Sequence, residues 1–268
     1  MTIADTRPAP GALRRRAFQP NWRQRAIWLG LAAYVVYAGS LLDITWARFV
    51  TGLSNGSRFL GRMFPPEFTR WEILLEGLVE SLQIAIIASV IGILLSLPIG
   101  LLAARNLMPA IVTVPARALI AFSRSFHPII VAIIFVKAIG FGALAGILAL
   151  ILASIGFIGK LFAEAIEEIS LKQVEAVRAT GASFFNVVIM GVLPQVLSRF
   201  IGFSTYQLDS NLRNSTMVGI VGGGGIGGTL FSAFQRFDYD FVAAILIAII
   251  AMIMIGEVIA GWLRKSFQ

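Results

Sequence analysis

Residues 164–195 read EAIEEISLKQVEAVRATGASFFNVVIMGVLPQ, a charged stretch that lies between two long apolar runs. A helix this polar cannot lie in hydrocarbon, because its charged side chains would lose their contact with water. The apolar runs on either side are long enough to cross a bilayer. We therefore interpret this stretch as a polar segment that projects from a membrane protein and contacts a soluble partner.

The composition also indicates an integral membrane protein. Of the 268 residues, 57% are hydrophobic and 13% are charged, and the mean hydropathy is +0.85. A soluble domain usually carries about 25% charged residues. The chain has no cysteine, which excludes disulfides and thiolate metal sites. We expect a single integral membrane domain that binds no metal.

Six apolar runs are expected to cross the bilayer as helices. A span needs roughly 20 apolar residues, and only helices and closed barrels satisfy their backbone groups in lipid. The runs lack the alternation of a barrel strand, so the predicted fold class is an all-α polytopic membrane protein. The expected spans are residues 26–42, 79–104, 117–139, 143–162, 184–206 and 241–263.

Basic residues predict the orientation of these spans. The net charge is +8, and six arginines precede the first span. Loops rich in Lys and Arg stay in the cytoplasm, so both termini are predicted to be cytoplasmic. No interleaving of aromatic and basic residues supports nucleic-acid binding, which we exclude as a function class. The six arginines are Arg7, Arg14, Arg15, Arg16, Arg23 and Arg25.

Counting spans from a cytoplasmic N-terminus then gives the domain organisation. Residues 1–25 form a cytoplasmic basic tail, and residues 43–78 form an outer segment, part of which could be an interfacial helix. Residues 79–268 form the core, with residues 207–240 outside. The charged segment at about residues 164–183 falls on the cytoplasmic side, in agreement with its basic residues.

The charged segment has the pattern of an exposed helix followed by a turn. Its charged residues recur at spacings of three to four and are expected to share one helical face. Gly181 permits a turn, and Pro194 allows a bend in the next helix. A solvated loop helix without a partner is the alternative. The charged residues are Glu164, Glu167, Glu168, Lys172, Glu175 and Arg178.

The spacing of Glu175-Ala176, Gly181 and Leu193-Pro194 resembles the coupling motif of bacterial ABC-importer permeases. In that motif, Glu-Ala-Ala is followed by Gly and then by Ile-x-Leu-Pro. Val177 replaces the third small residue here, and Gly191 stands where Ile is usual. The resemblance implies a type I permease-like core whose coupling residues bind an ATPase. They are Glu175, Ala176, Arg178, Gly181, Leu193 and Pro194.

Further stretches are similar to the phosphonate-importer permease subfamily. They are residues 159–167, 179–182, 193–195, 211–216 and 221–228. The resemblance implies a permease of the bacterial inner membrane with three kinds of protein partner. These are a cytoplasmic ABC ATPase dimer that holds ATP and Mg, a second permease copy or paralogue, and an outer substrate-binding protein. The chain itself would bind no cofactor.

Two departures from the subfamily pattern bear on the ligand. His127-Pro128-Ile129 stands where Pro-Glu is usual, and Asp209 stands about where Glu is common. Both positions are polar groups expected to face the pathway. The ligand is therefore interpreted as phosphonate or a related phosphorus oxyanion, such as phosphate or phosphite.

The glycine-rich stretch VGGGGIGG, residues 221–228, contains a G-x-G-x-x-G pattern at Gly222, Gly224 and Gly227. A dinucleotide site needs this turn inside a soluble βαβ unit, whereas membrane spans flank it here. We interpret the stretch, Gly225 included, as a broken helix that lines the pathway or its gate. A flexible outer loop is the alternative.

Polar residues in or next to the spans are the remaining pathway candidates. An intramembrane charge is costly unless it faces water or a partner. Arg117 and Arg124 are one heptad apart and share a face, with His127 one turn further along. Pairing of Arg213 with Asp209 is the alternative to a pathway role. The candidates are Arg124, His127, Asp209, Asn211, Arg213 and Ser215.

These expectations define a permease subunit of an ATP-driven importer that does not hydrolyse ATP itself. A stand-alone secondary transporter or channel for a small anion is the alternative. A membrane enzyme is disfavoured, because the chain has one His and no Cys, and most carboxylates lie in the loops.

Overall fold

The computed structural model describes residues 22–42 and 45–267, with side chains as far as residue 262. Every regular element in these ranges is helical, which confirms the all-α prediction. The elements are α1 (Trp22–Leu41), α2 (Trp46–Arg62), α3 (Trp71–Ala103), α4 (Ala110–Ser125), α5 (Pro128–Ile139), α6 (Ala143–Glu167), α7 (Leu171–Ala179), α8 (Phe184–Val187), the π-helical turn η1 (Val188–Val192), α9 (Leu193–Ile220), α10 (Ile226–Gln235) and α11 (Tyr239–Phe267).

The chain divides into two compact units, residues 1–60 and 61–268. The first unit contains α1 and nearly all of α2, and neither helix has a buried side chain. The predicted first span lies mainly within α1, and α2 lies in the predicted outer segment. The basic tail lies outside the described residues, apart from its last four positions.

Four helical stretches of the described chain are long and apolar enough to cross a membrane by themselves. These are α3, α6, residues 184–220 and residues 239–262. Two further pairs, α1 with α2 and α4 with α5, meet the criterion only when each pair is taken together. Length and composition therefore allow between four and six membrane spans, and the predicted number of six is the upper limit of this range.

The predicted continuous span 117–139 is wrong. The helix breaks at Phe126 and His127, and α4 and α5 meet at an angle of 91°. Pro128 is the physical cause, because a proline forces the residue before it out of the helical region. His127 accordingly has a ψ of 140°, and its Nδ1 accepts a hydrogen bond from the Ile129 amide at 3.4 Å.

The predicted span 184–206 is too short. The helical stretch continues through η1 and α9 to Ile220, so the polar residues 209–215 lie inside α9 rather than after it. Pro194 lies near the start of α9 and has no N–H to donate. The adjacent π-helical turn, in which the Leu193 amide donates to the Val188 carbonyl, carries the chain past this position.

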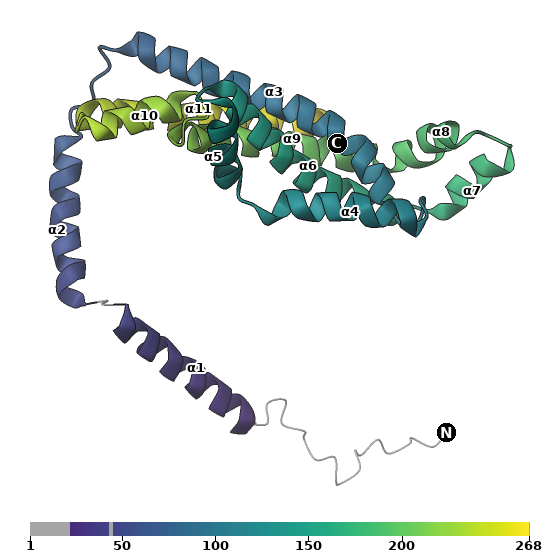
Figure 1. Cartoon of the computed structure of the whole chain (residues 1–268), viewed down its shortest axis with the longest axis horizontal. Coiled ribbons are helices and arrows are strands. Elements are labelled where there is room, and N and C mark those ends of the chain that lie inside the picture. The colour runs from purple at the N-terminus through teal and green to yellow at the C-terminus, as the bar shows by residue number, and fades with distance from the viewer. Residues whose placement is uncertain (1–21, 43–44, 268) are drawn as a thin grey trace, which may run out of the picture. The chain divides into compact units, whose positions relative to one another are not determined.

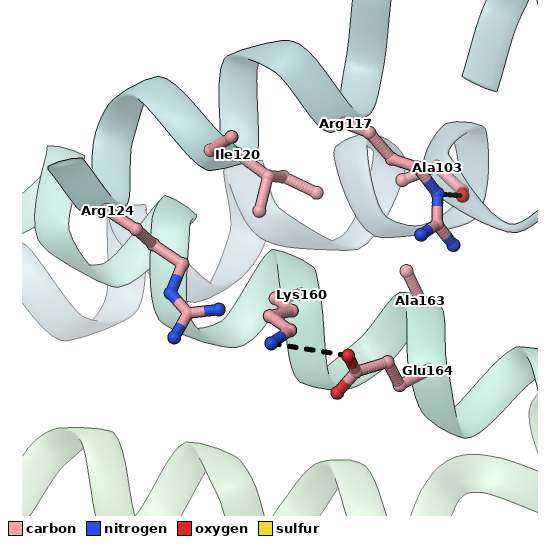
Figure 2. Close-up of a pocket in the computed structure, with 8 residues that line it drawn as sticks. Ala103, Arg117, Ile120, Arg124, Lys160, Ala163 and Glu164 are labelled. Carbon is pink, nitrogen blue, oxygen red and sulfur yellow. Dashed lines mark hydrogen bonds and ion pairs between the residues drawn. The ribbon is translucent and has the colours of Figure 1, made fainter. Parts of the chain in front are cut away.

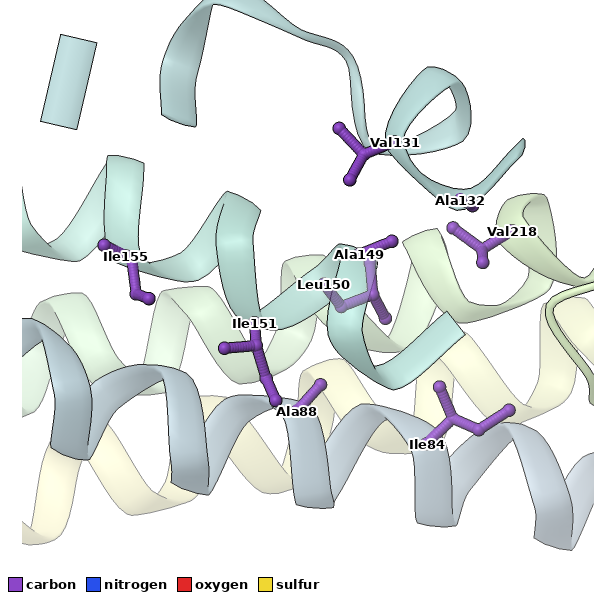
Figure 3. Packing of buried hydrophobic residues seen from close by; sticks show 9 residues of the cluster. All are labelled: Ile84, Ala88, Val131, Ala132, Ala149, Leu150, Ile151, Ile155 and Val218. Carbon is purple, nitrogen blue, oxygen red and sulfur yellow. The ribbon is translucent and has the colours of Figure 1, made fainter. Parts of the chain in front are cut away.

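The second unit is organised around α6, which packs against α3, α4, α5 and α9. Figure 3 shows buried side chains from α3, α5, α6 and α9 meeting in one apolar cluster. Small residues bring α3 and α6 especially close: a Cβ on Gly92 would lie 2.5 Å from Cβ of Ser154. Such small residues are typical of interfaces between membrane helices, because they allow close backbone approach.

The glycine-rich stretch is a tightly packed turn between α9 and α10. Gly222, Gly224 and Gly225 adopt positive φ angles of 95°, 82° and 79°, which favour glycine. The Ile226 amide donates to Ser81 Oγ of α3 at 2.9 Å. Close packing against α3, α6 and α9 does not agree with a flexible loop. The helix does break here, but its role in the pathway remains a prediction.

Residues 63–70 are fixed to the start of α11 by charged contacts. The Arg70 guanidinium lies 2.6 Å from Glu67, 2.7 Å from Asp238 and 3.8 Å from the centre of the Phe241 ring. Hydrogen bonds from the Thr69 hydroxyl and from Arg70 lower the pKa of Glu67 below its ordinary value. This end of the core lies opposite the end that carries α7 and α8 (Figure 1).

A methyl group at Gly92 should destabilise the core. We expect Gly92→Ala to lower the free energy of unfolding by about 1–3 kcal/mol, because it forces α3 away from α6. Thermal unfolding of the purified protein in detergent measures the effect. Gly202→Ala is the control, since a Cβ there has no atom within 4 Å. Equal unfolding temperatures for the two variants would contradict the importance of this contact.

Candidate functional site

The first candidate site is the segment that joins α6 to α9. On α7, Val174 is buried against Val187, Val192 and Val196, which anchors the short helix to the core. Glu175, Ala176 and Arg178 are all exposed on the same helix. The Val174 side of α7 is packed against the core, and these three predicted coupling residues remain accessible to another molecule.

The prediction that one helix carries all the charged residues of this segment is wrong. α6 ends at Glu167 and α7 begins at Leu171, so Glu164 and Glu167 belong to the end of α6 and Glu168 caps it. They form ion pairs of their own, Glu164 with Lys160, Glu167 with Arg117 and Glu168 with Arg199. Of the six charged residues expected on one helical face, only Lys172, Glu175 and Arg178 lie on α7, where all three are exposed.

Two glycines shape the turn after α7. Gly181 has a φ of 77°, a conformation that suits glycine, and it lets the chain reverse towards α8. Gly191 is buried, and a Cβ there would lie 3.3 Å from Cα of Val174. The close approach of α7 thus leaves little room for a larger residue at Gly191, the position where the motif usually has Ile.

The side chain of Gln195 connects the start of α7 to α9. Its Oε1 accepts from the Ser170 amide at 3.0 Å, and its Nε2 donates to the Gly191 carbonyl at 2.6 Å. Arg199 of α9 forms a second link, at 2.5 Å, to Glu168 at the end of α6. Sequence reasoning assigned no role to Gln195. The i, i+4 spacing from Gly191 was the available signal, but the contact with Ser170 depends on the fold.

The second candidate site is a pocket of about 260 Å³ between α4 and α6. Its charged residues are Arg117, Arg124, Lys160 and Glu164, and its other lining residues are Ala103, Ile120, Ala121 and Ala163. Figure 2 shows the side chains of Arg124 and Lys160 projecting into the same space from the two helices. Sequence reasoning identified Arg124 but missed Lys160, whose approach to Arg124 depends on helix packing.

The cations of this pocket differ in how firmly they are held. Arg117 donates to the Ala103 carbonyl at 2.9 Å and to Glu167 at 2.6 Å. Lys160 lies 3.4 Å from Glu164, and both side chains are nearly half exposed. Arg124 is exposed and has no ion pair with any residue that the structure describes.

His127 does not share a helix with Arg124, contrary to the prediction. It precedes α5, where its exposed side chain caps the helix start. The sharp bend between α4 and α5 separates the two residues' helices, and His127 is not among the residues that line the pocket. The expected continuous polar face is therefore interrupted after Arg124.

Asp209 and Arg213 form an ion pair on α9, with Arg213 Nη2 lying 2.6 Å from Asp209 Oδ2. The structure thus contains the ion pair that was expected as the alternative to a pathway role for Arg213. Arg213 remains exposed on its other side. Asp209 Oδ1 is buried and has no hydrogen-bond donor within the described ranges. Whether the pair faces the pathway remains a prediction.

Asn211 and Ser215 lie inside the helix packing of this chain and do not face an opening. Both are fully buried. Asn211 Nδ2 donates to Ser89 Oγ at 2.9 Å and to Ser154 Oγ at 3.0 Å. Gln207, which the site prediction omitted, donates to Asn211 Oδ1 at 2.9 Å. These amides therefore join α3, α6 and α9, and the predicted pathway position of Asn211 and Ser215 does not agree with this burial.

The chain belongs to the family of binding-protein-dependent transport system inner membrane components, whose family model matches residues 96–268. It is therefore a transport permease component that crosses the membrane several times, as its resemblance to ABC-importer permeases implied. The match begins near the end of α3 and includes both candidate sites.

Curated relatives support this membership over most of the chain. A phosphite transport system permease protein of Stutzerimonas stutzeri is 40% identical over 251 residues, which cover 92% of this chain and 90% of that protein. A phosphate-import permease protein of Mycolicibacterium smegmatis is 37% identical over 264 residues. The alignment covers 95% of this chain but only 50% of the mycobacterial protein.

Solved structures show the same fold. An inward-facing structure of the MetNI methionine ABC transporter matches with a TM-score of 0.65 and 23% identity. The match covers 75% of this chain and 99% of the transporter chain. An amino acid ABC transporter matches with a TM-score of 0.60. The predicted permease-like core is thereby confirmed at the level of the fold.

Removal of the Gln195 amide should loosen α7. We expect Gln195→Ala to increase hydrogen–deuterium exchange of residues 171–179 about tenfold, because hydrogen bonds that each contribute about 0.5–1.5 kcal/mol are lost. Mass spectrometry of the purified protein measures the exchange. Asn186→Ala, a change at an exposed amide, is the control. Unchanged protection in Gln195→Ala would show that the valine contacts alone hold α7.

Proposed function

We propose that this chain is the permease subunit of an ATP-driven importer of a phosphorus oxyanion, such as phosphite, phosphate or a phosphonate. The observation that supports the substrate class most directly is the 40% identity to a phosphite permease along almost the whole of both chains. The relative named for phosphate import supports the same class of ligand. Discrimination among these oxyanions would rest mainly on a separate binding protein.

The proposed partners follow from family membership and from the accessible α7. A cytoplasmic ATPase dimer would bind Glu175, Ala176 and Arg178, and ATP and Mg would be bound there and not by this chain. A second permease, identical or related, would complete the pathway, and an outer binding protein would deliver the ligand. The proposed orientation places both termini and α7 in the cytoplasm, as the distribution of basic residues predicts.

The contacts of α7 suggest how work would reach the pathway. ATP-driven closure of the ATPase pair would move α7. The movement would pass into α9 through buried Val174, through Gln195 and through the Arg199–Glu168 pair. Arg213 lies 18 residues beyond Gln195, or about 27 Å along the helix axis. Leu193 and Pro194, at the start of α9, would lie where this movement enters the helix.

Uptake by a reconstituted complex tests the function. Vesicles that contain this permease, its ATPase and its binding protein should accumulate phosphite, phosphate or methylphosphonate only when ATP is supplied to the ATPase. Sulfate serves as the comparison anion. Uptake by the permease alone, without ATP, would instead support a secondary transporter or channel, and failure with all three phosphorus oxyanions would reject the proposed ligand class.

Charge reversal at Glu175 tests the coupling role. We expect Glu175→Arg to weaken copurification of the ATPase and to reduce ATP-driven uptake at least tenfold, because the residue is exposed at the proposed contact. The unfolding temperature should stay unchanged, since the side chain is not buried. Glu72→Arg is the matched control, because Glu72 is an exposed carboxylate in the first turn of α3, at the end of the core away from α7 (Figure 1). Normal ATPase retention by Glu175→Arg would contradict the docking role.

A further inference from the structure

We propose that the pocket between α4 and α6 is an oxyanion site, in which Arg124 and Lys160 directly bind the oxygens of a phosphate, phosphite or phosphonate group. The transported anion is one source of such a group, and an anionic phospholipid headgroup is another. The first source rests on the proposed function. The second does not, so the site and the transport activity can fail independently.

The pocket has the size and charge for a small anion. Its volume of about 260 Å³ would hold roughly nine waters, at about 30 Å³ for each water. Arg117, Arg124 and Lys160 contribute three positive charges, and Glu164 contributes one negative charge. Glu167, bonded to Arg117, removes a second positive charge. One positive charge remains, and a singly charged oxyanion would neutralise it.

The contacts within the pocket indicate which cations are available. Arg117 donates hydrogen bonds to the backbone carbonyl of Ala103 and to the Glu167 carboxylate. Its guanidinium is therefore already occupied and is not counted among the cations that bind the anion. Lys160 and Glu164 are 3.4 Å apart, longer than the 2.7–2.9 Å of a strong charge-assisted hydrogen bond. An exposed pair of this kind contributes little stability, so an anion can compete with Glu164 for Lys160.

The position of Arg124 depends on a glycine in the facing helix. A Cβ at Gly156 of α6 would lie 2.8 Å from Cγ of Arg124 and 3.1 Å from Cβ of Ser123. The aliphatic part of Arg124 thus packs on the backbone of α6 at Gly156, and its guanidinium lies to the side of Lys160 in the view of Figure 2. This close fit sets where the stem of Arg124 leaves α4 on the side of the pocket that Lys160 also lines.

The chemistry of the two side chains suits a tetrahedral oxyanion. A guanidinium offers several N–H donors in a plane that can contact two oxygens at once, and an ammonium acts as a point charge. An exposed site of low net charge would also bind weakly, which transport requires, since a tightly held ion would stall. The Arg117–Glu167 pair connects this pocket with the end of α6, next to the segment that joins α6 to α9.

Binding of radiolabelled orthophosphate, phosphite and methylphosphonate to the detergent-purified complex of permease and ATPase tests the site. We expect Arg124→Gln and Lys160→Gln each to weaken binding about tenfold. Arg124→Lys should lie between the original protein and Arg124→Gln. Lys137→Gln is the matched control, because Lys137 is an exposed lysine near the end of α5 that does not line the pocket.

Glu164→Gln provides a test with the opposite sign. Removal of the carboxylate that competes for Lys160 should strengthen binding of the same probes several-fold. A pocket whose charges serve only helix packing would not show tighter binding. Failure of Glu164→Gln to strengthen binding, together with unchanged affinity in Arg124→Gln, would overturn the proposal.

Two further measurements distinguish the sources of the oxyanion. For the transported anion, Arg124→Gln should raise the KM of ATP-driven uptake in vesicles of phosphatidylcholine, whose zwitterionic headgroup has no net charge. For a lipid headgroup, native mass spectrometry should show phosphatidylglycerol retained by the original protein and by Lys137→Gln but lost from Arg124→Gln.

A complex that binds none of the three labelled probes and retains no phosphatidylglycerol would overturn the site. ATP-driven uptake by that same complex would leave the proposed function standing. Conversely, retained phosphatidylglycerol without any uptake would support the site and reject the transport proposal.

Discussion

The close contact between α3 and α6 is the constraint on which the rest of the core depends. Two membrane helices gain little by burying apolar surface from lipid, so their association relies on packing and on polar contacts. Here the missing side chain of Gly92 on α3 lets Ser154 of α6 approach closely. Ser96 Oγ of α3 also donates a hydrogen bond to the Ser154 carbonyl at 3.3 Å. Asn211 then joins α9 to the same serine. The buried amides are thus a structural connection between three helices.

Both candidate sites follow from the position of α6 in this core. One end of α6 leads directly into the segment that joins α6 to α9, and another side of α6 faces α4 across the basic pocket. Arg117 and Glu167 connect the pocket to that end at 2.6 Å. A displacement of α7 would therefore act on α9 through the Ser170–Gln195 hydrogen bond, and on the end of α6 through the short connection of residues 168–170.

Sequence reasoning succeeded where the signal is local and failed where it depends on packing. Hydropathy was enough for the all-α fold, and the spacing of Glu175, Gly181 and Leu193-Pro194 was enough for the family. The break at Pro128 was locally readable, but apolar residues on both sides of it suggested one continuous span. Neither the burial of Asn211 nor the approach of Lys160 to Arg124 could be predicted, because each depends on which helix packs against which.

The break between α4 and α5 restricts what can surround it. At such a break, the last carbonyls of one helix and the first amides of the next lose their helical partners. His127 Nδ1, which accepts from the Ile129 amide at 3.4 Å, supplies only part of the replacement. Hydrocarbon tails offer no hydrogen bonds, so non-helical backbone needs water or protein beside it wherever it enters a bilayer. The corner at His127 therefore marks a side of the molecule that acyl chains cannot solvate.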